Sequence, residues 1–310
     1  MPDRGIAFYR SISPLHPGSG ESRGSIDNAI QREAHTDWPM SGVKGAFRSL
    51  WRQYVVETDK SVISLACADK IPDTVRLFGR DVNDEDEVGD GVLLFPDARI
   101  FAFPVRSAKG LFALVTCAHA INNMLEQALV VAGIPSPLNG TYGAINGENA
   151  EFTYAEQFVL NGSNQAFLED VMLTSIDSTA ETESLKNWLV QNNILSESNA
   201  RRLAVVSDDV FTYFVRFCTF NAQRNKLDKQ TKKVEPTALF VVEYLPPETV
   251  LYSPVVEKKA GHQGTGSSYD DWKDMLAHFN FLLNIGGDGT IGKGWCWVKC
   301  IDEPDAVRTE

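Results

Sequence analysis

Apolar residues along the chain recur at two spacings, which predict two kinds of secondary structure. Between residues 43 and 56 they return every three or four positions, as on the buried face of an amphipathic helix. Short runs of β-branched and aromatic residues bounded by turn-forming residues are typical of strands. The sequence therefore predicts helices over 43–56, 120–133, 180–203, 208–218 and 269–285, and strands over 5–16, 91–95, 98–105, 111–117, 151–160, 202–207, 238–245, 249–256 and 295–301.

The order of these elements bears on the fold class. Helices and strands are mixed without strict alternation, and several predicted strands follow one another directly. The strands 91–95 and 98–105 are joined by Pro96 and Asp97, a pair typical of tight turns, which predicts a hairpin. The helix 208–218 begins with an aspartate that is expected to cap it. We therefore expect an α+β fold rather than a doubly wound parallel sheet.

Charge is distributed unevenly along the chain, whose formal net charge is −12. Taken alone, a negative total argues against a nucleic-acid partner, because such partners favour basic surfaces. Residues 81–90 carry six acids and are expected to form a surface loop, whereas the stretch 216–233 is basic. We expect an exposed arm or hairpin over 219–235. The cations of the basic stretch are Arg216, Arg224, Lys226, Lys229, Lys232 and Lys233.

Cysteine usage and the longest apolar runs bear on the cellular setting. The chain has five cysteines, an odd number, and no CxxC pair, so neither a disulfide framework nor a zinc site is expected. Cys296 and Cys300 alternate with Val298 along the last predicted strand and are interpreted as buried thiols. No signal-peptide pattern and no stretch approaching a membrane span occurs. We therefore expect a cytoplasmic protein without a membrane partner.

A glycine-rich loop lies between the last predicted helix and the last predicted strand. Its sequence, GGDGTIGKG, matches the GxGxxG pattern through Gly287, Gly289 and Gly292, and the GxxxxGK pattern through Lys293. The context argues against both nucleotide-binding motifs, because a helix precedes the loop, a strand follows it, and no Ser or Thr follows the lysine. Closely spaced glycines and a lysine can still bind the phosphates of an RNA backbone. A plain glycine turn is the alternative.

The segment 26–48 gathers acids, a histidine and cations. Asp27, Arg32, Glu33, His35 and Asp37 lie within eleven residues of one another. Such groups can serve metal-assisted or general acid–base attack on a phosphodiester, and they can equally form a capped loop. Lys44, Arg48 and Arg52 follow at every fourth position and line one face of the predicted helix. That stripe is either a track for phosphates or a solvated helix face.

Seven segments occur in an order that is shared with a known family. LHPGSG, IDNAIQREAHTDWP, VKGAFR, LFG, DARIFAFPVRS, VEYLPPET and GGDGTIGKG run collinearly through nearly the whole chain. Together they resemble the RAMP superfamily, specifically the backbone subunit of the type III-B (Cmr) CRISPR effector complex. The resemblance implies one RAMP-type domain over 1–310, with an RNA-recognition-motif-like (ferredoxin-like) core and inserted finger and thumb elements. The candidate thumb covers about residues 216–255, and a position nearer 256–269 stays open.

The resemblance also implies roles for particular residues. In that family the aspartate of the IDN motif is required for target cleavage, and it falls on Asp27. His16 and Glu243 are expected to assist Asp27 in catalysis. The lysine and arginine of the family's KGxxR segment bind the guide backbone and fall on Lys44 and Arg48. Further RNA contacts are expected from Arg32, Arg52, Arg224, Lys226, Gly286, Gly287, Gly292, Lys293 and Gly294.

The activity that the resemblance implies is RNA-guided cleavage of RNA. Copies of the subunit would stack along one guide RNA (crRNA), beside other subunits of the Cmr complex, and would cut complementary single-stranded target RNA at regular intervals. Asp27 would hold a divalent cation, Mg²⁺ or Mn²⁺, or would orient the attacking 2′-hydroxyl. Two alternatives stay open. One is a structural guide-binding subunit in which Asp27 is only a turn residue, and the other is a metal-free nuclease that matures guide RNA.

Overall fold

The computed structural model of the chain describes residues 3–80, 90–225, 239–258 and 267–302. Its mixture of helices and strands confirms the predicted α+β class. The helices are α1 (Lys44–Thr58), α2 (Leu65–Ala68), α3 (Pro72–Phe78), α4 (Ala118–Glu126), α5 (Ala180–Gln191), α6 (Glu197–Ala200), α7 (Asp208–Phe217) and α8 (Ser268–His278), with a π-helical turn η1 (Gln127–Val131) and 3₁₀ turns η2 (Ala155–Gln157) and η3 (Gly289–Ile291). The strands are β1 (Arg4–Ser11), β2 (Met40–Ser41), β3 (Leu93–Leu94), β4 (Ala98–Arg106), β5 (Phe112–Cys117), β6 (Asn149–Phe152), β7 (Gln165–Leu168), β8 (Val171–Ile176), β9 (Leu203–Val206), β10 (Phe220–Arg224), β11 (Phe240–Tyr244), β12 (Val250–Glu257), β13 (Leu282–Asn284) and β14 (Trp295–Asp302).

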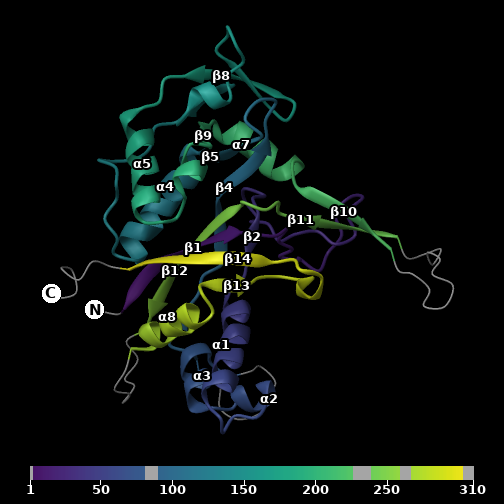
Figure 1. The fold of residues 1–310 in the computed structure, drawn as a ribbon, viewed down its shortest axis with the longest axis vertical. Coiled ribbons are helices and arrows are strands. Elements are labelled where there is room, and N and C mark those ends of the chain that lie inside the picture. Colours follow the sequence, from purple (N-terminus) through teal and green to yellow (C-terminus); the bar gives the residue numbers. More distant parts are fainter. Residues whose placement is uncertain (1–2, 81–89, 226–238, 259–266, 303–310) are drawn as a thin grey trace.

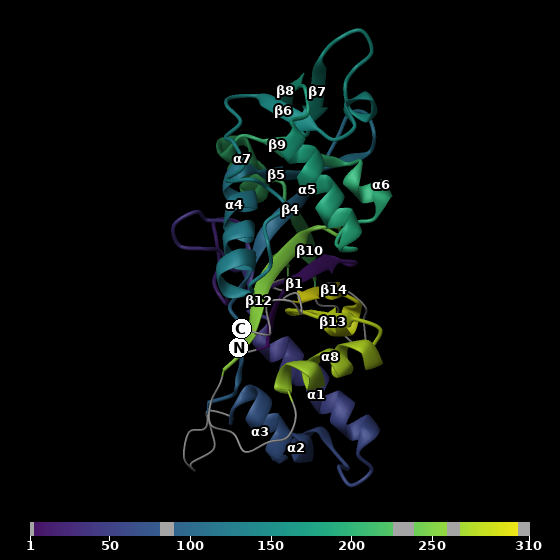
Figure 2. The ribbon, with the colours of Figure 1, turned by 90° about the vertical axis from the view of Figure 1, so that its left-hand side faces the viewer.

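Twelve of the described strands form one large mixed sheet. Its main path runs β13-β14-β1-β12-β4-β5-β9-β6-β8-β7, while β2 joins β4 and β3 joins β12. Only the pairs β5–β9 and β6–β8 are parallel among the described ladders. The helices α1, α2 and α3 lie at one end of the elongated molecule, and β7 and β8 lie at the other (Figure 1, Figure 2).

Strand β1, which lies between β14 and β12, sends alternate side chains to opposite faces of the sheet, and each face has its own hydrophobic core. Tyr9 lies in the core beneath α1, with its ring centroid 6.0 Å from that of Phe47. Phe8 lies in the core on the other face, with its ring centroid 6.2 Å from that of Trp188 in α5. The strand is therefore buried on both faces, as its dense run of apolar residues requires.

The predicted hairpin between residues 91–95 and 98–105 is wrong. Strands β3 and β4 do not pair with each other but follow one another along the same edge of β12. β3 pairs with Val256 of that strand and β4 pairs with Tyr252. Pro254 lies between these two pairings and has no amide hydrogen, so the ladder is interrupted there. Pro96 and Asp97 thus lie between two strands that pair with the same side of β12, and they do not form the turn of a hairpin.

Further predictions need correction. The predicted strand 151–160 is strand only to Phe152, after which the chain turns through η2. The predicted helix 269–285 ends as α8 and gives way to β13, because Asn280 and Phe281 adopt positive φ angles that a helix cannot continue through. The cap of α7 is the Ser207 hydroxyl, which accepts a hydrogen bond from the Val210 amide, and not the aspartate that follows. Strands β7 and β8 were not predicted.

The cysteines of the chain are all free, as expected. Cys296 is buried on β14, and burial raises the pKa of its thiol to about 12. Cys300 lies four residues further along β14, on the same face of the strand, and is half-buried.

Within the described residues, no helix is both long and apolar enough to cross a bilayer.

The strands β10 and β11 form a separate two-stranded sheet that projects from the body of the molecule (Figure 1). Their register pairs Phe220 with Tyr244 and Arg224 with Phe240. This hairpin begins where the exposed arm was expected. The rest of that arm, including Lys226, lies outside the described residues, as does most of the acidic stretch 81–90.

Candidate functional site

Strand β11 anchors the segment that contains Asp27. The amides of Asp27 and Asn28 donate hydrogen bonds to the carbonyl of Val241, at 3.0 and 3.1 Å. In return the Val241 amide donates to Oδ2 of Asp27 at 2.7 Å. Asp27 is exposed, and its Oδ1 atom has no hydrogen-bond partner in the described part of the chain. One carboxylate oxygen is therefore fixed by the backbone, while the other is available to a ligand.

The same strand holds His16. Its Nδ1 atom lies 2.7 Å from the carbonyl oxygen of Glu243. A carbonyl only accepts, so this contact assigns the ring hydrogen to Nδ1 and leaves Nε2 free in the neutral imidazole. Val241 and Glu243 are two residues apart on β11, a span of about 7 Å. The anchor points of Asp27 and His16 are therefore close neighbours on one strand.

A groove of about 430 Å³ lies between these segments and the glycine loop. Its wall is made mostly of glycine and of polar or small side chains, so a ligand can approach the backbone closely. Asn28, the neighbour of Asp27, is part of the wall. The lining residues are His16, Pro17, Gly18, Gly20, Asn28, Ala29, Gln31, Ser41, Gly42, Gly286 and Gly287.

Glu243 and Arg32 are placed inside the protein rather than in this groove. The Arg32 guanidinium lies 2.6 Å from Oε1 of Glu243, and the two side chains are 6% and 1% exposed. Oε1 also accepts a hydrogen bond from the Thr219 hydroxyl, at 2.9 Å. Oε2 accepts one from the amide of Ile30, at 3.1 Å. Glu243 thus fixes the backbone that follows Asp27, which is a positioning role.

The glycine loop is fastened to the β10–β11 hairpin through Asp288. Its Oδ1 accepts a hydrogen bond from Arg224 at 2.9 Å, and its Oδ2 accepts one from the Tyr244 hydroxyl at 2.8 Å. Burial, together with the adjacent carboxylate, raises the pKa of Tyr244 to about 12. Lys293 lies with its Nζ 5.4 Å from the centroid of the Tyr244 ring. The loop and the hairpin therefore form one surface.

Three glycines of the loop adopt φ angles that favour glycine. These are Gly286, Gly292 and Gly294, with φ of 79°, 78° and 81°. A Cβ at Gly286 would collide with the carbonyl oxygen of His16, which also accepts a hydrogen bond from the Gly287 amide at 2.8 Å. Gly286 therefore allows the loop to lie directly against the His16 segment.

The cationic stripe of α1 divides into two parts. Arg48 and Arg52 share the carboxylate of Asp69, which follows α2, at 3.3 and 3.1 Å. Lys44, at the start of α1, is exposed and has no charged partner among the described residues. Lys44 is therefore the member of the stripe whose charge is uncompensated.

The remaining charged residues of the segment 26–48 stabilise its loop. Glu33 lies 3.0 Å from Arg99, and Asp37 lies 3.2 Å from Arg216. His35 is exposed. Within the described residues, no three His, Cys, Asp or Glu side chains gather as a metal site. Asp27 adjoins the groove through its neighbour Asn28, and the Asp97 carboxylate lies near Gly42 of the groove wall, 3.5 Å from where a Cβ of that residue would be.

Three residues with a part in this geometry were not singled out from the sequence. Asn28 lines the groove, and Tyr244 and Asp288 join the hairpin to the glycine loop. Each lies within a segment that carried the family resemblance, next to a residue that was singled out. Their contacts are with residues far away in the sequence, so spacing alone gives no signal for them.

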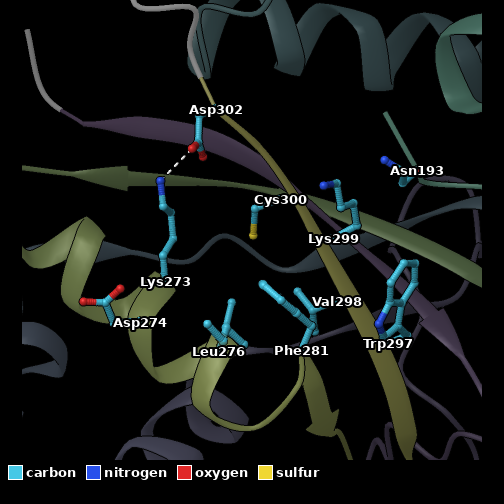
Figure 3. A pocket seen from close by; sticks show the side chains of 11 residues that line it. Asn193, Lys273, Asp274, Leu276, Phe281, Trp297, Val298, Lys299, Cys300 and Asp302 are labelled. Atoms are coloured by element: carbon cyan, nitrogen blue, oxygen red, sulfur yellow. Dashed lines mark hydrogen bonds and ion pairs between the residues drawn. The ribbon is translucent and has the colours of Figure 1, made fainter. Parts of the chain in front are cut away.

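A second cavity, of about 530 Å³, lies between α8 and β14 (Figure 3). Leu276, Phe281 and Val298 make it largely apolar. At its rim Lys273 and Asp302 are already paired, with Nζ 2.6 Å from Oδ2. None of the candidate residues named above lines this cavity, so it is separate from the groove.

A model of the RAMP superfamily matches residues 8–297 of the chain. The chain is similar to "CRISPR system Cmr endoribonuclease Cmr4" from Pyrococcus furiosus, with 29% identity over 304 residues that cover 94% of each protein. It is also similar to "CRISPR system CMR subunit Cmr4" from Saccharolobus solfataricus, with 23% identity over 322 residues that cover 96% of each.

Solved structures share the fold. The oligomeric Cmr4 crystal structure from Pyrococcus furiosus superposes with a TM-score of 0.67 at 24% identity, covering 96% of this chain and 97% of that one. A subunit of the type III-B Cmr-beta complex bound to cognate target RNA superposes with a TM-score of 0.66 at 18% identity, covering 96% of both chains. The architecture is therefore that of known Cmr subunits over nearly its full length.

Proposed function

The chain belongs to the RAMP superfamily, and from that premise we propose that it is the backbone subunit of a type III-B CRISPR effector complex. In this role it binds guide RNA along a filament of its own copies, beside other Cmr subunits, and cleaves complementary target RNA. The Pyrococcus furiosus relative is named an endoribonuclease, and a structural relative was solved with cognate target RNA. Both support the proposal.

The observation that carries the cleavage function is the arrangement at the groove. Asp27 offers one carboxylate oxygen that is anchored to Val241 and one that has no partner among the described residues. His16 lines the groove, with Nδ1 fixed to the Glu243 carbonyl. Its Nε2 atom lies next to Gly18, because a Cβ built there would be 2.8 Å from it. An imidazole nitrogen in the groove, and an exposed carboxylate on the residue next to Asn28 of the groove wall, are suited to proton transfer at a phosphodiester.

The reaction that fits these groups is internal transesterification of RNA. The 2′-hydroxyl of one nucleotide attacks the adjacent phosphorus, and the bond from phosphorus to the 5′-oxygen breaks. The products are a 2′,3′-cyclic phosphate and a 5′-hydroxyl. His16 accepts the proton of the attacking 2′-hydroxyl at Nε2, and water supplies a proton to the leaving oxygen. DNA lacks the attacking hydroxyl, so it is not a substrate.

The free oxygen of Asp27 is suited to hold a divalent cation, Mg²⁺ or Mn²⁺. Mg²⁺ is usually bound by one or two carboxylates and keeps several of its waters, so a single exposed carboxylate fits it. When bound, the cation would supply positive charge near the phosphate that is cut. Asp27 is exposed, so its side chain is open to a hydrated ion from solvent.

We propose in addition that residues 1–310 act as one RAMP-type domain whose large sheet contains an RNA-recognition-motif-like core. The β10–β11 hairpin is the base of its thumb. It projects from the body (Figure 1). Its Arg224 donates a hydrogen bond to Asp288 of the glycine loop. The sequence adds Lys226 and further cations directly beyond β10. A cationic projecting hairpin is suited to contact an RNA backbone.

A reconstituted complex with guide RNA, complementary target RNA and Mg²⁺ tests the proposal, with target binding and cutting scored separately. Asp27→Asn keeps an acceptor for the Val241 amide and removes the charge, so it should bind target as well as wild type and should not cut it. EDTA should abolish cutting by wild type. A deoxynucleotide at the cut position should resist cleavage.

One observation favours a second candidate, a structural guide-binding subunit. The Asp27 carboxylate accepts a hydrogen bond from the Val241 amide. An aspartate that only stabilises a turn would make the same kind of contact. Unchanged cutting by Asp27→Asn would support that candidate and place the nuclease in a partner chain. Continued cutting in EDTA would instead indicate a metal-free enzyme of the guide-maturing kind.

A further inference from the structure

The β10–β11 hairpin has two faces of different chemistry. Phe220 and Tyr244 are directly opposite one another in its register, as are Arg224 and Phe240, so these side chains share one face. Glu243 lies on the other face, where its carboxylate is buried. One face of the hairpin therefore secures the Asp27 segment, while the other is aromatic and cationic.

Phe220 is the exposed member of the aromatic face. It is 45% exposed, and its ring centroid lies 5.9 Å from that of the buried Tyr244. Lys293 of the glycine loop reaches over both rings, with Nζ 6.0 Å from the Phe220 centroid and 5.4 Å from the Tyr244 centroid. An aromatic ring that is backed by a second ring offers a flat surface on which a planar group can stack, and the neighbouring cation can attract a negative charge attached to that group.

Asp288 holds this surface in place before any ligand binds. It accepts hydrogen bonds from both Arg224 and Tyr244, which ties the glycine loop to the two strands of the hairpin. Arg224 also lies over the Tyr244 ring, with its guanidinium carbon 5.6 Å from the ring centroid. Because these side chains are ordered already, a ligand need not order them on binding.

The aromatic face continues directly from the groove. The ring of His16, which lines the groove, has its centroid 5.5 Å from that of Tyr244. Tyr244 in turn is adjacent to Phe220, so the three rings lead from the groove to the exposed Phe220 face. A strand of RNA that lies in the groove would extend past this face.

Resting on the proposed RNA binding, we infer that Phe220 is a stacking platform for one unpaired nucleobase of the bound RNA. Lys293 lies beside the phosphate of that nucleotide. Every base has a flat π face, so such a platform accepts any sequence. It selects an unpaired nucleotide, because the base of a paired one is covered by its neighbours in the helix. Phe220 would thus contribute affinity for single-stranded RNA that charge alone does not supply.

The test uses the full-length protein and two fluorescently labelled RNAs of equal length, one with normal bases and one abasic. Phe220→Leu keeps an apolar side chain against Tyr244 but removes the ring. Its affinity should fall about tenfold for the RNA with bases and should not change for the abasic RNA. Phe220→Trp should restore the affinity, because the indole ring stacks as well.

A matched control is available at Tyr154. It is 43% exposed and has the guanidinium carbon of Arg201 5.4 Å from its ring centroid, but it lies beside β6, away from the groove. Tyr154→Leu should bind both RNAs as wild type does. Thermal melting of each variant shows that it is folded.

The outcomes separate the platform from the function on which it rests. If wild type binds RNA while Phe220→Leu binds it equally well, or loses affinity equally for the abasic RNA, the platform is refuted and the proposed function stands. If wild type binds neither RNA, even within the reconstituted complex, the proposed function itself fails and the platform with it.

Discussion

The guanidinium of Arg32 and the carboxylate of Glu243 meet at 2.6 Å in the interior of the protein, 211 residues apart in the sequence. Arg32 also donates hydrogen bonds to the carbonyls of Asp37 and Val215, both at 3.0 Å. The pair thereby joins three parts of the chain: the loop after Asp27, the end of α7, and β11. Glu243 also accepts a hydrogen bond from the amide of Ile30, three residues after Asp27. The position of Asp27 therefore depends on Glu243.

Glu243→Gln should destabilise the protein by about 3 kcal/mol, because it leaves the buried Arg32 charge without a charged partner. Glu248→Gln is the matched control. Its carboxylate lies 3.0 Å from Arg10, but both side chains are about 30% exposed, and such pairs contribute about 1 kcal/mol or less. Urea denaturation of both variants measures the difference. Equal stabilities would show that the Arg32 pair is not buried as described.

The same variant separates positioning from catalysis. If Glu243 positions the Asp27 loop, cleavage should fall in parallel with stability and should be partly recovered at low temperature. A complete loss of cleavage in a variant of wild-type stability would instead give Glu243 a direct catalytic role.

Gly286→Ala should be far more disruptive than Gly292→Ala, although the two φ angles are nearly the same. At Gly286 the added Cβ collides with the His16 carbonyl, whereas at Gly292 no atom lies within 4 Å. Gly292→Ala should therefore cost only the backbone strain, about 1–2 kcal/mol. Gly286→Ala should cost about 1–3 kcal/mol more and should weaken RNA binding at the groove. Denaturation and RNA titration of the two variants provide the comparison.

The parts of the fold that sequence could predict are those set by local pattern. Phe8 and Tyr9 alternate across β1, and the apolar positions of α1 recur at helical spacing, so both elements were predicted. The arrangement of β3 and β4 was not, because it depends on β12, which lies more than a hundred residues further along the chain. Pro254 on that distant strand, and not the local turn pair, decides how the two segments lie.

The same division applies to the candidate site. The motif segments singled out His16 and the glycine loop, and the structure brings both to one groove. Sequence spacing could not show that Arg48 and Arg52 share Asp69, because Asp69 approaches α1 only after the chain turns through α2. A stripe of cations on a helix gives no sign of which cations are already paired.

The hydrogen bond from Tyr244 to Asp288 should make the free energy of unfolding of the protein depend on pH in the alkaline range. The pKa of Tyr244 is raised to about 12 in the folded protein, above its ordinary value near 10, so folding favours the neutral phenol. Its stabilisation is therefore complete below about pH 10 and is lost as the pH rises toward 12. The stability difference between wild type and Tyr244→Phe should be constant up to about pH 10 and then shrink. A difference that grows with pH would contradict this assignment.

Alkylation should distinguish the cysteines. The thiolate is the reactive form, and burial raises the pKa of Cys296 to about 12, so little thiolate forms there at neutral pH. Cys67 lies in the short helix α2 and is exposed. Iodoacetamide should therefore label Cys67 first and should reach Cys296 only when the protein is unfolded, as mass spectrometry of the peptides would show. Labelling of both at the same rate would mean that the core around β14 opens readily.

Lys44→Ala and Asp69→Asn should change RNA binding in opposite directions. Lys44 is exposed and has no charged partner in the part of the chain that the structure describes. Its loss should therefore weaken binding and reduce the salt dependence by about 0.7 in log–log slope, the value of one phosphate contact on single-stranded RNA. Asp69→Asn releases Arg48 and Arg52 from their shared carboxylate, so it should strengthen binding and steepen that slope. Fluorescence anisotropy over a range of salt concentrations measures both. Lys186→Ala, on α5 and paired with Glu183, is the control. A loss at Lys44 that is the same at every salt concentration would exclude a phosphate contact.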